Sequence, residues 1–441
     1  MAKTRQAFFV SALFFLCVFL LFSGACSTHG NGRLLPGNFT REQVQADFSQ
    51  LRSALESTHP DRLRYETAET LSSLFNAAYD SLRDDMSEGE FFRVVAPLVA
   101  RYHCGHTQIR PSSGFAVGPV LPLGIYLVDG KGYVDADYGS GATIAPGSEV
   151  LAINNEPLTA IVERMLAGIS ADARNTSATI QRLNRYFFLY YYYFWGEMAG
   201  FDLRLKSPAN GAESLVRVNA RAYAEVNNEV SSRFAASGRL ALAINGNLAV
   251  LTVPSFVVSQ NPDFRVFFED AFRRMNAGGV ERLIIDIRNN GGGAPELSVA
   301  LIAHLAREPF IYFKTGLGYP DLFAATAPHA VHFSGTVLVL IDGGCFSTSG
   351  HFCALVRHLG LAVFVGETGG GTFRCHDNSR EFVLNNTRMN IRIAQTTYEA
   401  AVPDQDVSTG FPPDFRVVPA ISDILSRTDV QMDFAKQKGA E

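Results

Sequence analysis

The sequence predicts an α/β protein whose C-terminal half alternates strands with helices. From about residue 240, short apolar runs of strand length are followed by segments with helical spacing of apolar residues. The runs at 282–288 and 336–341 are rich in large apolar residues, which is typical of parallel strands covered on both faces. Hydrophobic residues make up 47% of the 441-residue chain, which also has 38 glycines and 19 prolines. This composition fits a large globular core and excludes a collagen-like or low-complexity protein.

Residues 1–26 have the pattern of an export signal. Two positive charges precede an apolar run from Ala7 to Phe22, and small residues then lead to Cys26. The run is shorter than the ~20 residues that a spanning helix needs, which argues against an uncleaved membrane anchor. The small-small-Cys ending resembles a bacterial lipobox, in which Cys26 is acylated and becomes the new N-terminus. We therefore expect a lipoprotein signal peptide, a tether over 27–38, and a protein anchored by lipid in the bacterial cell envelope, facing the periplasm or the outer surface.

Charge and cysteine content exclude two further classes. With 38 basic and 43 acidic side chains the net charge is −5, so the chain has no electrostatic footprint for nucleic acid. With Cys17 in the signal and Cys26 acylated, four cysteines remain in the body. Their pairing is open, and free buried thiols are the alternative to a Cys104–Cys345 link. No pair has metal-ligand spacing, so we expect no metal site. The four are Cys104, Cys345, Cys353 and Cys375.

Residues 39–114 predict a helical N-terminal unit. Apolar residues recur at spacings of three and four, as at Phe48, Leu51 and Leu55, which marks amphipathic helices. The His59-Pro60 pair is expected to end the first helix, because the residue before a proline avoids helical geometry.

Residues 115–235 predict a strand-rich module with connecting helices. Strand-like segments at 121–128 and 133–137 flank the turn signal Asp-Gly-Lys-Gly at 129–132, and a further strand near 150 precedes a helix around 158–166. This order resembles a PDZ module, although other small β modules give the same pattern. PDZ modules bind chain ends by adding a peptide strand to a sheet edge. We interpret the aromatic run at 186–195 as a buried helix rather than a ligand site.

Residues 236–430 contain the candidate chemistry at two strand ends. Asn-Gly-Gly-Gly at 290–293 follows a buried strand, and glycines there let backbone N–H groups face a ligand or an oxyanion. The alternative is a plain strand–helix turn, and the motif is no dinucleotide or phosphate loop. Ser347 follows the next strand and opens a helix, where it sits in a positive partial field. The alternative there is a helix-capping serine.

A nucleophilic hydroxyl needs a base, which is usually a histidine within hydrogen-bonding reach. Spacing alone does not choose among the nine histidines of the body. They are His59, His103, His106, His304, His329, His332, His351, His358 and His376.

Several motifs in order resemble the tail-specific (C-terminal processing) serine peptidase family, which includes the core of the tricorn protease. The resemblance rests on segments 283–293, 337–347 and 365–370, together with Gly-His-Thr at 105–107 and the late motif at 410–414. Together they cover most of residues 41–430. The resemblance implies a ClpP/crotonase-like α/β catalytic core, with the helical unit and the PDZ-like module before it and a C-terminal tail over 431–441.

The family pattern also implies roles for individual residues. Ser347, 19 residues before Gly366, takes the place of the nucleophile, rather than Ser349. The oxyanion hole would use the backbone N–H groups of Thr348 and Gly292, with Gly291 as the alternative to Gly292. One branch of the family has a lysine base, but Thr372 stands at that position. The tricorn-like branch uses a histidine in a Gly-His-Thr setting, which points to His106.

The sequence departs from the family pattern at two positions. Gly350 stands where a glutamate often follows the nucleophile, and Gly105 stands where the tricorn protease has a serine. The acid that would orient His106 is therefore open. Glu399, Asp404 and Asp406 are candidates by approximate position.

The sequence as a whole predicts an exported serine endopeptidase. Ser347 would attack a peptide carbonyl and form an acyl-enzyme, with His106 as the base. The PDZ-like module would recognise C-terminal segments of protein or peptide substrates. No metal or organic cofactor is expected, and the membrane is reached through the lipid anchor. The rival hypothesis is a non-catalytic peptide- or lipid-binding lipoprotein on the same fold.

Overall fold

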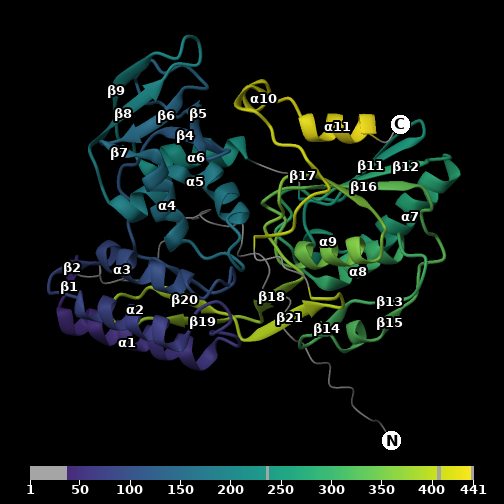
Figure 1. The fold of residues 1–441 in the computed structure, drawn as a ribbon, viewed down its shortest axis with the longest axis horizontal. Helices are drawn as coiled ribbons and strands as arrows, with labels where there is room; N and C mark the ends of the chain where they lie inside the picture. The colour runs from purple at the N-terminus through teal and green to yellow at the C-terminus, as the bar shows by residue number, and fades with distance from the viewer. Residues whose placement is uncertain (1–36, 235–237, 405–408, 439–441) are drawn as a thin grey trace, which may run out of the picture.

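The computed structural model describes residues 37–234, 238–404 and 409–438. Figure 1 shows three parts: helices of the N-terminal unit in purple, a strand-rich module in blue and teal, and a larger α/β part in green and yellow. The predicted signal peptide, Cys26 and most of the tether lie outside the described residues. Among the helices that are described, none is both long enough and apolar enough to cross a membrane.

The N-terminal unit is helical, as predicted. It consists of α1 (Arg41–Thr58), α2 (Ala68–Asp80) and α3 (Glu88–Ala100), with a short pairing of β1 (Asn38–Phe39) and β2 (Met86–Ser87). Thr40 and Ser87 form capping boxes that satisfy free N–H groups at the starts of α1 and α3. The first helix ends at Thr58, directly before His59-Pro60.

The strand-rich module is an antiparallel sheet in the order β4-β5-β6-β8-β9, with β7 paired to β6. The predicted turn is confirmed, because Asp129 and Gly130 have positive φ between β4 and β5. The aromatic run lies in α5, where Phe187, Phe188 and Tyr191 are buried in the core. The elements are β4 (Leu123–Val128), β5 (Lys131–Asp137), β6 (Glu149–Ile153), β7 (Glu156–Pro157), α4 (Leu158–Gly168), α5 (Ser177–Trp195), β8 (Gly200–Lys206), β9 (Glu213–Asn219) and α6 (Tyr223–Arg233).

The α/β part is built on a sheet in the order β10-β11-β12-β16-β17-β22. Every pairing is parallel except β10 with β11, which confirms the predicted, mostly parallel sheet. The strands are β10 (Ala241–Asn245), β11 (Leu248–Thr252), β12 (Arg282–Asp286), β16 (Thr336–Ile341), β17 (Val363–Gly366) and β22 (Phe415–Arg416). The principal helices are α7 (Phe264–Ala277), α8 (Pro295–Ala303) and α9 (Thr348–His358), and they share one buried cluster with the sheet.

Most of the predicted C-terminal tail, residues 431–441, lies in a helix. Residues 430–438 form α11 (Val430–Lys438), which follows the short helix α10 (Ile421–Ser426). Ala435 is buried with Ile284, Leu338 and Val365 on the sheet face opposite α8 and α9. This helix is not recognisable from the sequence, because charged residues interrupt the few apolar residues of the segment.

A second difference concerns residues 374–400, which cross back to the N-terminal unit. Within them β20 (Asn390–Ile393) pairs with β3 (Gln108–Arg110) and with β19 (Arg380–Val383). Figure 1 shows β19 and β20 among the purple helices. The flanking strands β18 (Arg374–Asp377) and β21 (Thr396–Ala400) pair with each other beside the α/β part. Through this crossing, the segment that contains residue 106 is held next to the α/β part.

Candidate active site

Ser347 lies at the sharp turn between the end of β16 and the start of α9. Its φ of 56° and ψ of −121° are unusual for a residue with a side chain. Although it occupies the capping position of α9, its side chain makes no capping hydrogen bond. The structure thus disfavours the helix-capping explanation. Backbone strain of this kind persists only where surrounding contacts enforce it, and it is concentrated at functional sites.

The two residues after Ser347 hold the turn in place. Thr348 Oγ1 donates to the carbonyl of Gly293 at 2.5 Å, and Ser349 Oγ donates to the carbonyl of Asn290 at 2.7 Å. Both hydroxyls are buried and engaged with the glycine turn. Ser349 is therefore a structural residue, and Ser347 is the serine left for chemistry.

The glycine turn lies directly against Ser347. A Cβ on Gly292, whose φ is +97°, would stand 2.7 Å from the carbonyl oxygen of Phe346 and 3.0 Å from the backbone nitrogen of Thr348. Only glycine fits there. The N–H of Gly292 donates to Asn290 Oδ1 at 2.9 Å, so this predicted oxyanion donor is already engaged.

The other predicted oxyanion donor is free of such a partner. The N–H of Thr348 is the first amide of α9, and within the described residues it makes no hydrogen bond. The same holds for the N–H of Gly291, the alternative donor in the turn, across the described parts of the chain. Free amides at a helix start favour a negatively charged oxygen.

His106 reaches this turn from the N-terminal unit. It lies two residues before β3, whose pairing with β20 fixes its place. The ring of His106 stacks on that of Phe346, the residue before Ser347, with centroids 4.8 Å apart. His106 thus lies against the residue next to Ser347, although no hydrogen bond joins the His106 and Ser347 side chains in the described residues. Catalytic hydrogen bonds are often loose before substrate binds.

The carboxylate beside His106 is Asp377, which the sequence analysis missed. Asp377 Oδ2 lies 3.5 Å from His106 Nε2. Of the predicted candidates, Glu399 and Asp404 instead pair with Lys314, at 3.0 and 2.8 Å. Asp406 lies outside the described residues. No local pattern marks Asp377, because the β20–β3 crossing is what brings its neighbourhood to His106.

Burial and charge set the protonation of this pair. Burial lowers the pKa of His106, while the carboxylate of Asp377 acts to raise it. Burial alone would raise the pKa of Asp377, but the charges of His106 and Arg392 outweigh it and hold that pKa below its usual value. Arg392 Nη2 lies 2.9 Å from Asp377 Oδ1. At neutral pH the site therefore holds a neutral imidazole against an ionised carboxylate, the arrangement that a general base requires.

A cysteine and a second histidine also lie near the Ser347 side chain. The Ser347 side chain hydrogen-bonds the thiol of Cys375, whose pKa burial raises well above its ordinary value. His351 Nε2 lies 3.5 Å from Cys375 Sγ, and burial lowers the pKa of His351 to about 3. The His351 ring is thus linked to the Ser347 hydroxyl through the thiol, while the His351 backbone N–H donates to the carbonyl of Ser347 at 3.3 Å.

The structure explains the departures from the family pattern. A Cβ on Gly105 would stand 2.5 Å from the end of the Phe346 ring, so a serine there would require that ring to shift. A Cβ on Gly350 would stand 2.6 Å from the backbone of Thr372, so no glutamate fits there. The hydroxyl of Thr372 donates a hydrogen bond to the carbonyl of Arg374.

The four body cysteines are free thiols, so the hypothetical Cys104–Cys345 link is absent. Cys345 Sγ instead donates to the carbonyl of Ile287 at 3.1 Å. Within the described residues, no group of three or more His, Cys, Asp or Glu side chains is placed to hold a metal ion.

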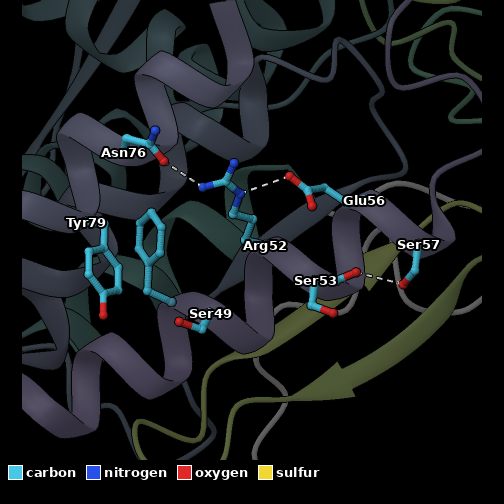
Figure 2. Close-up of a pocket in the computed structure, with 8 residues that line it drawn as sticks. Ser49, Arg52, Ser53, Glu56, Ser57, Asn76 and Tyr79 are labelled. Carbon is cyan, nitrogen blue, oxygen red and sulfur yellow. Dashed lines mark hydrogen bonds and ion pairs between the residues drawn. The ribbon is translucent and has the colours of Figure 1, made fainter. Parts of the chain in front are cut away.

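A cavity of about 570 Å³ lies between α1 and α2, apart from Ser347 (Figure 2). Arg52 crosses it and bonds to Asn76 and to Glu56, each at 2.9 Å. The polar groups of these three side chains are thus hydrogen-bonded to one another.

Comparison with known proteins finds similarity in the α/β part and in the overall fold. Residues 247–417 match the model of peptidase family S41. The structure of mature CPAF is similar over 90% of this chain and 96% of its own, with a TM-score of 0.68 and 15% identity. Mature CPAF complexed with lactacystin gives a TM-score of 0.67 and 15% identity over 90% of this chain and 98% of its own. At this identity the likeness shows a shared fold.

The family domain and the mixed α/β fold define a serine-type peptidase. Residues 247–417 carry the domain of peptidase family S41, the family that the sequence motifs resemble. This confirms the family and the enzyme class expected from the sequence motifs.

Proposed function

We propose that this protein is an exported serine endopeptidase with Ser347 as nucleophile and His106 as general base, as in the tricorn-like branch. The observation that carries the proposal is the strained, uncapped turn at Ser347 with the His106–Asp377 pair stacked against its neighbour Phe346. Asp377 joins the proposed site as the positioning acid.

The geometry suggests how protons move. His106 Nε2 faces Asp377, whereas Nδ1 is buried without a hydrogen-bond partner in the described residues. We assign the Nε2–H tautomer on this basis, so Nδ1 takes the proton from Ser347 Oγ. As Oγ bonds to the substrate carbonyl, the carbonyl oxygen gains negative charge, which the N–H of Thr348 and an N–H of the glycine turn stabilise.

The second half of the reaction uses the same groups. His106 returns the proton to the leaving amine as the peptide bond breaks, which leaves an acyl-enzyme on Ser347. Water then attacks the ester while His106 accepts its proton, and the product carboxylate departs. Gly292 can assist in the oxyanion hole only after its N–H releases Asn290 Oδ1.

Two features favour an enzyme over the rival, a non-catalytic binding lipoprotein. One is the buried His106–Asp377 pair stacked against the neighbour of Ser347. The other is the strained backbone of Ser347, which a purely structural serine would not need.

The Cys26 lipid anchor remains part of the proposal on the lipobox pattern. It predicts a diacylglyceryl-modified Cys26 at the N-terminus of membrane-extracted protein, and an intact signal peptide there would refute it.

The proposed activity is tested with a library of unstructured peptides blocked at both ends. Mass spectrometry of the products is expected to show cleavage at internal bonds without added metal or cofactor. If only end residues are removed, or if no peptide is cut at any substrate length, the endopeptidase proposal fails.

Replacing Asp377 with asparagine is expected to lower kcat roughly 100- to 10,000-fold at neutral pH. Because the carboxylate raises the pKa of His106, its loss should also move the acid limb of kcat/KM to lower pH. The pH profile separates this positioning role from mere loss of stability. Asp404→Asn is the matched control, since Asp404 pairs with Lys314 near the surface. An unchanged pH profile in Asp377→Asn, or equal losses in both variants, contradicts the assignment.

A further inference from the structure

Strand β4 ends its sheet, and its outer edge is where an added peptide strand would pair. The edge strand of an antiparallel sheet presents backbone N–H and C=O groups that are not used by its neighbour. Peptide recognition by strand addition depends on such free groups. The predicted capture of substrate C-termini by this module therefore requires an open edge at β4.

Helix α5 occupies that edge with an amide side chain. The N–H of Leu127 donates to Asn184 Oδ1 at 2.7 Å, and Asn184 Nδ2 donates to the carbonyl of Leu127 at 3.2 Å. A carboxamide carries the same donor and acceptor as a peptide unit. Asn184 thus makes, at Leu127, the pair of hydrogen bonds that an added strand would make.

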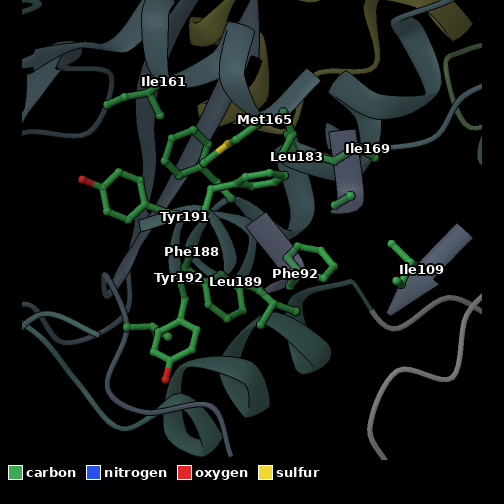
Figure 3. Packing of buried hydrophobic residues seen from close by; sticks show 14 of the residues in the cluster. Phe92, Ile109, Ile161, Met165, Ile169, Leu183, Phe188, Leu189, Tyr191 and Tyr192 are labelled. Carbon is green, nitrogen blue, oxygen red and sulfur yellow. The ribbon is translucent and has the colours of Figure 1, made fainter. Parts of the chain in front are cut away.

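Apolar packing fills the space beside the same edge. Leu183 and Phe187 of α5 are fully or almost fully buried in one cluster with Ile125 and Leu127. Figure 3 shows Ile161 and Met165 of α4 beside the aromatic side chains of α5. At Gly168, the end of α4, an added Cβ would lie 2.3 Å from the Phe194 ring. Helix α5 therefore covers β4 at Ile125 and Leu127, and α4 packs against α5.

The same segment is anchored to the loops around Ser347. One helical turn before Asn184, Gln181 Nε2 donates to Asn289 Oδ1 at 2.8 Å and to Asp342 Oδ2 at 3.3 Å. Asp342 Oδ1 in turn accepts from the N–H of Asn289, at the start of the glycine turn, at 2.8 Å. Upstream, Asn175 Nδ2 donates to the carbonyl of Gly369 at 2.9 Å.

The segment also supports His106. Asp172 Oδ1 accepts from the N–H of Gly105, the residue before His106, at 2.7 Å. Withdrawing α5 from β4 would thus pull on the glycine turn and on the histidine loop together. The edge cannot open without disturbing the proposed catalytic site.

We propose that α5 is the built-in occupant of the β4 edge and takes the place of a peptide ligand there. Substrates are consequently not held at this edge by their C-terminal ends, and the enzyme acts on internal segments that reach Ser347 directly. This inference rests on the proposed endopeptidase function and replaces the expectation of C-terminal recognition.

The test measures deuterium uptake of the peptide fragment containing residues 123–128. It uses the Ser347→Ala variant with a saturating amount of a peptide that the wild type cleaves and that has a free C-terminal carboxylate. Binding is verified separately by fluorescence anisotropy. We expect no added protection of 123–128. Protection of this fragment by the peptide would overturn the proposal.

Two comparisons complete the test. Wild-type kcat/KM should agree within about twofold between peptides that differ only in a C-terminal carboxylate or carboxamide, since an uncontacted group changes little. A preference above about tenfold for the carboxylate counts against a closed edge. Asn184→Ala should raise uptake in 123–128 several-fold, whereas Arg182→Ala, two positions away on another helix face, should not. Equal uptake in both variants would contradict the role of Asn184.

Asn184→Asp serves if the alanine variant does not fold, because it keeps the acceptor for Leu127 N–H and loses the donor. Its uptake in 123–128 should also exceed that of Arg182→Ala. The uptake comparison of the Asn184 and Arg182 variants needs no turnover, so it separates the two proposals. An enzyme that cleaves nothing defeats the proposed function, whereas peptide protection of 123–128 in an enzyme that cleaves defeats only the closed edge.

Discussion

Replacing Ser347 with alanine is expected to lower kcat by roughly five to six orders of magnitude, the scale at which a serine peptidase loses its nucleophile. The fold should persist, because the Ser347 side chain caps no helix. Turnover of a fluorogenic peptide and the melting temperature, measured on the same preparation, check both statements.

Ser349→Ala is the matched control for that experiment. Ser349 is fully buried, and its hydroxyl donates to the carbonyl of Asn290. Its loss should cost about 1 kcal/mol of the free energy of unfolding while leaving kcat within about tenfold of the wild type. Equal losses of kcat in the two variants, or turnover that survives Ser347→Ala, would show that the nucleophile is misassigned.

The second large effect is expected at His106. His106→Ala should reduce kcat/KM by about three to five orders of magnitude, because the variant loses the group proposed to take the Ser347 proton. His351→Gln is the control. His351 is also a buried histidine near Ser347, but it faces the Cys375 thiol. We expect it to lose stability and to retain turnover. The reverse ranking of the two variants would identify His351 as the base.

The pH dependence follows from the direction of the His106 pKa. Only the neutral imidazole ring accepts a proton. The value of kcat/KM must therefore rise with pH as the protonated His106 ring loses its extra proton. Because burial lowers that pKa, kcat/KM should increase at a pH below the ordinary histidine pKa of about 6.5. It should reach a plateau before neutral pH. An increase in kcat/KM that begins only at about pH 10 would indicate a lysine base instead.

The sequence predicted elements whose signal is local. The strand at 336–341 coincides with β16, because an uninterrupted apolar run is bounded there by Gly335 and Asp342. The Asp129-Gly130 turn was equally visible, since it needs two residues that tolerate positive φ. Ser347 and the glycine turn were recognisable because strand ends carry chemistry in parallel sheets.

What the sequence could not show depends on contacts between distant segments. Asp377 reaches His106 because β20 pairs with β3, which lies about 280 positions earlier in the chain. Asn184 lies in a segment whose pattern predicted only a buried helix, and nothing local shows that its amide closes the β4 edge. The engagement of the Gly292 N–H by Asn290 is likewise a property of one side-chain conformation.

The central claim is that Ser347 is an activated nucleophile. A fluorophosphonate probe reacts with such a hydroxyl and forms a stable adduct, and peptide mapping locates the labelled residue. We expect one adduct, on Ser347, that forms in the wild type, is lost in Ser347→Ala and is strongly slowed in His106→Ala. Absence of labelling in folded wild-type protein, or labelling that moves to another serine, would contradict the account.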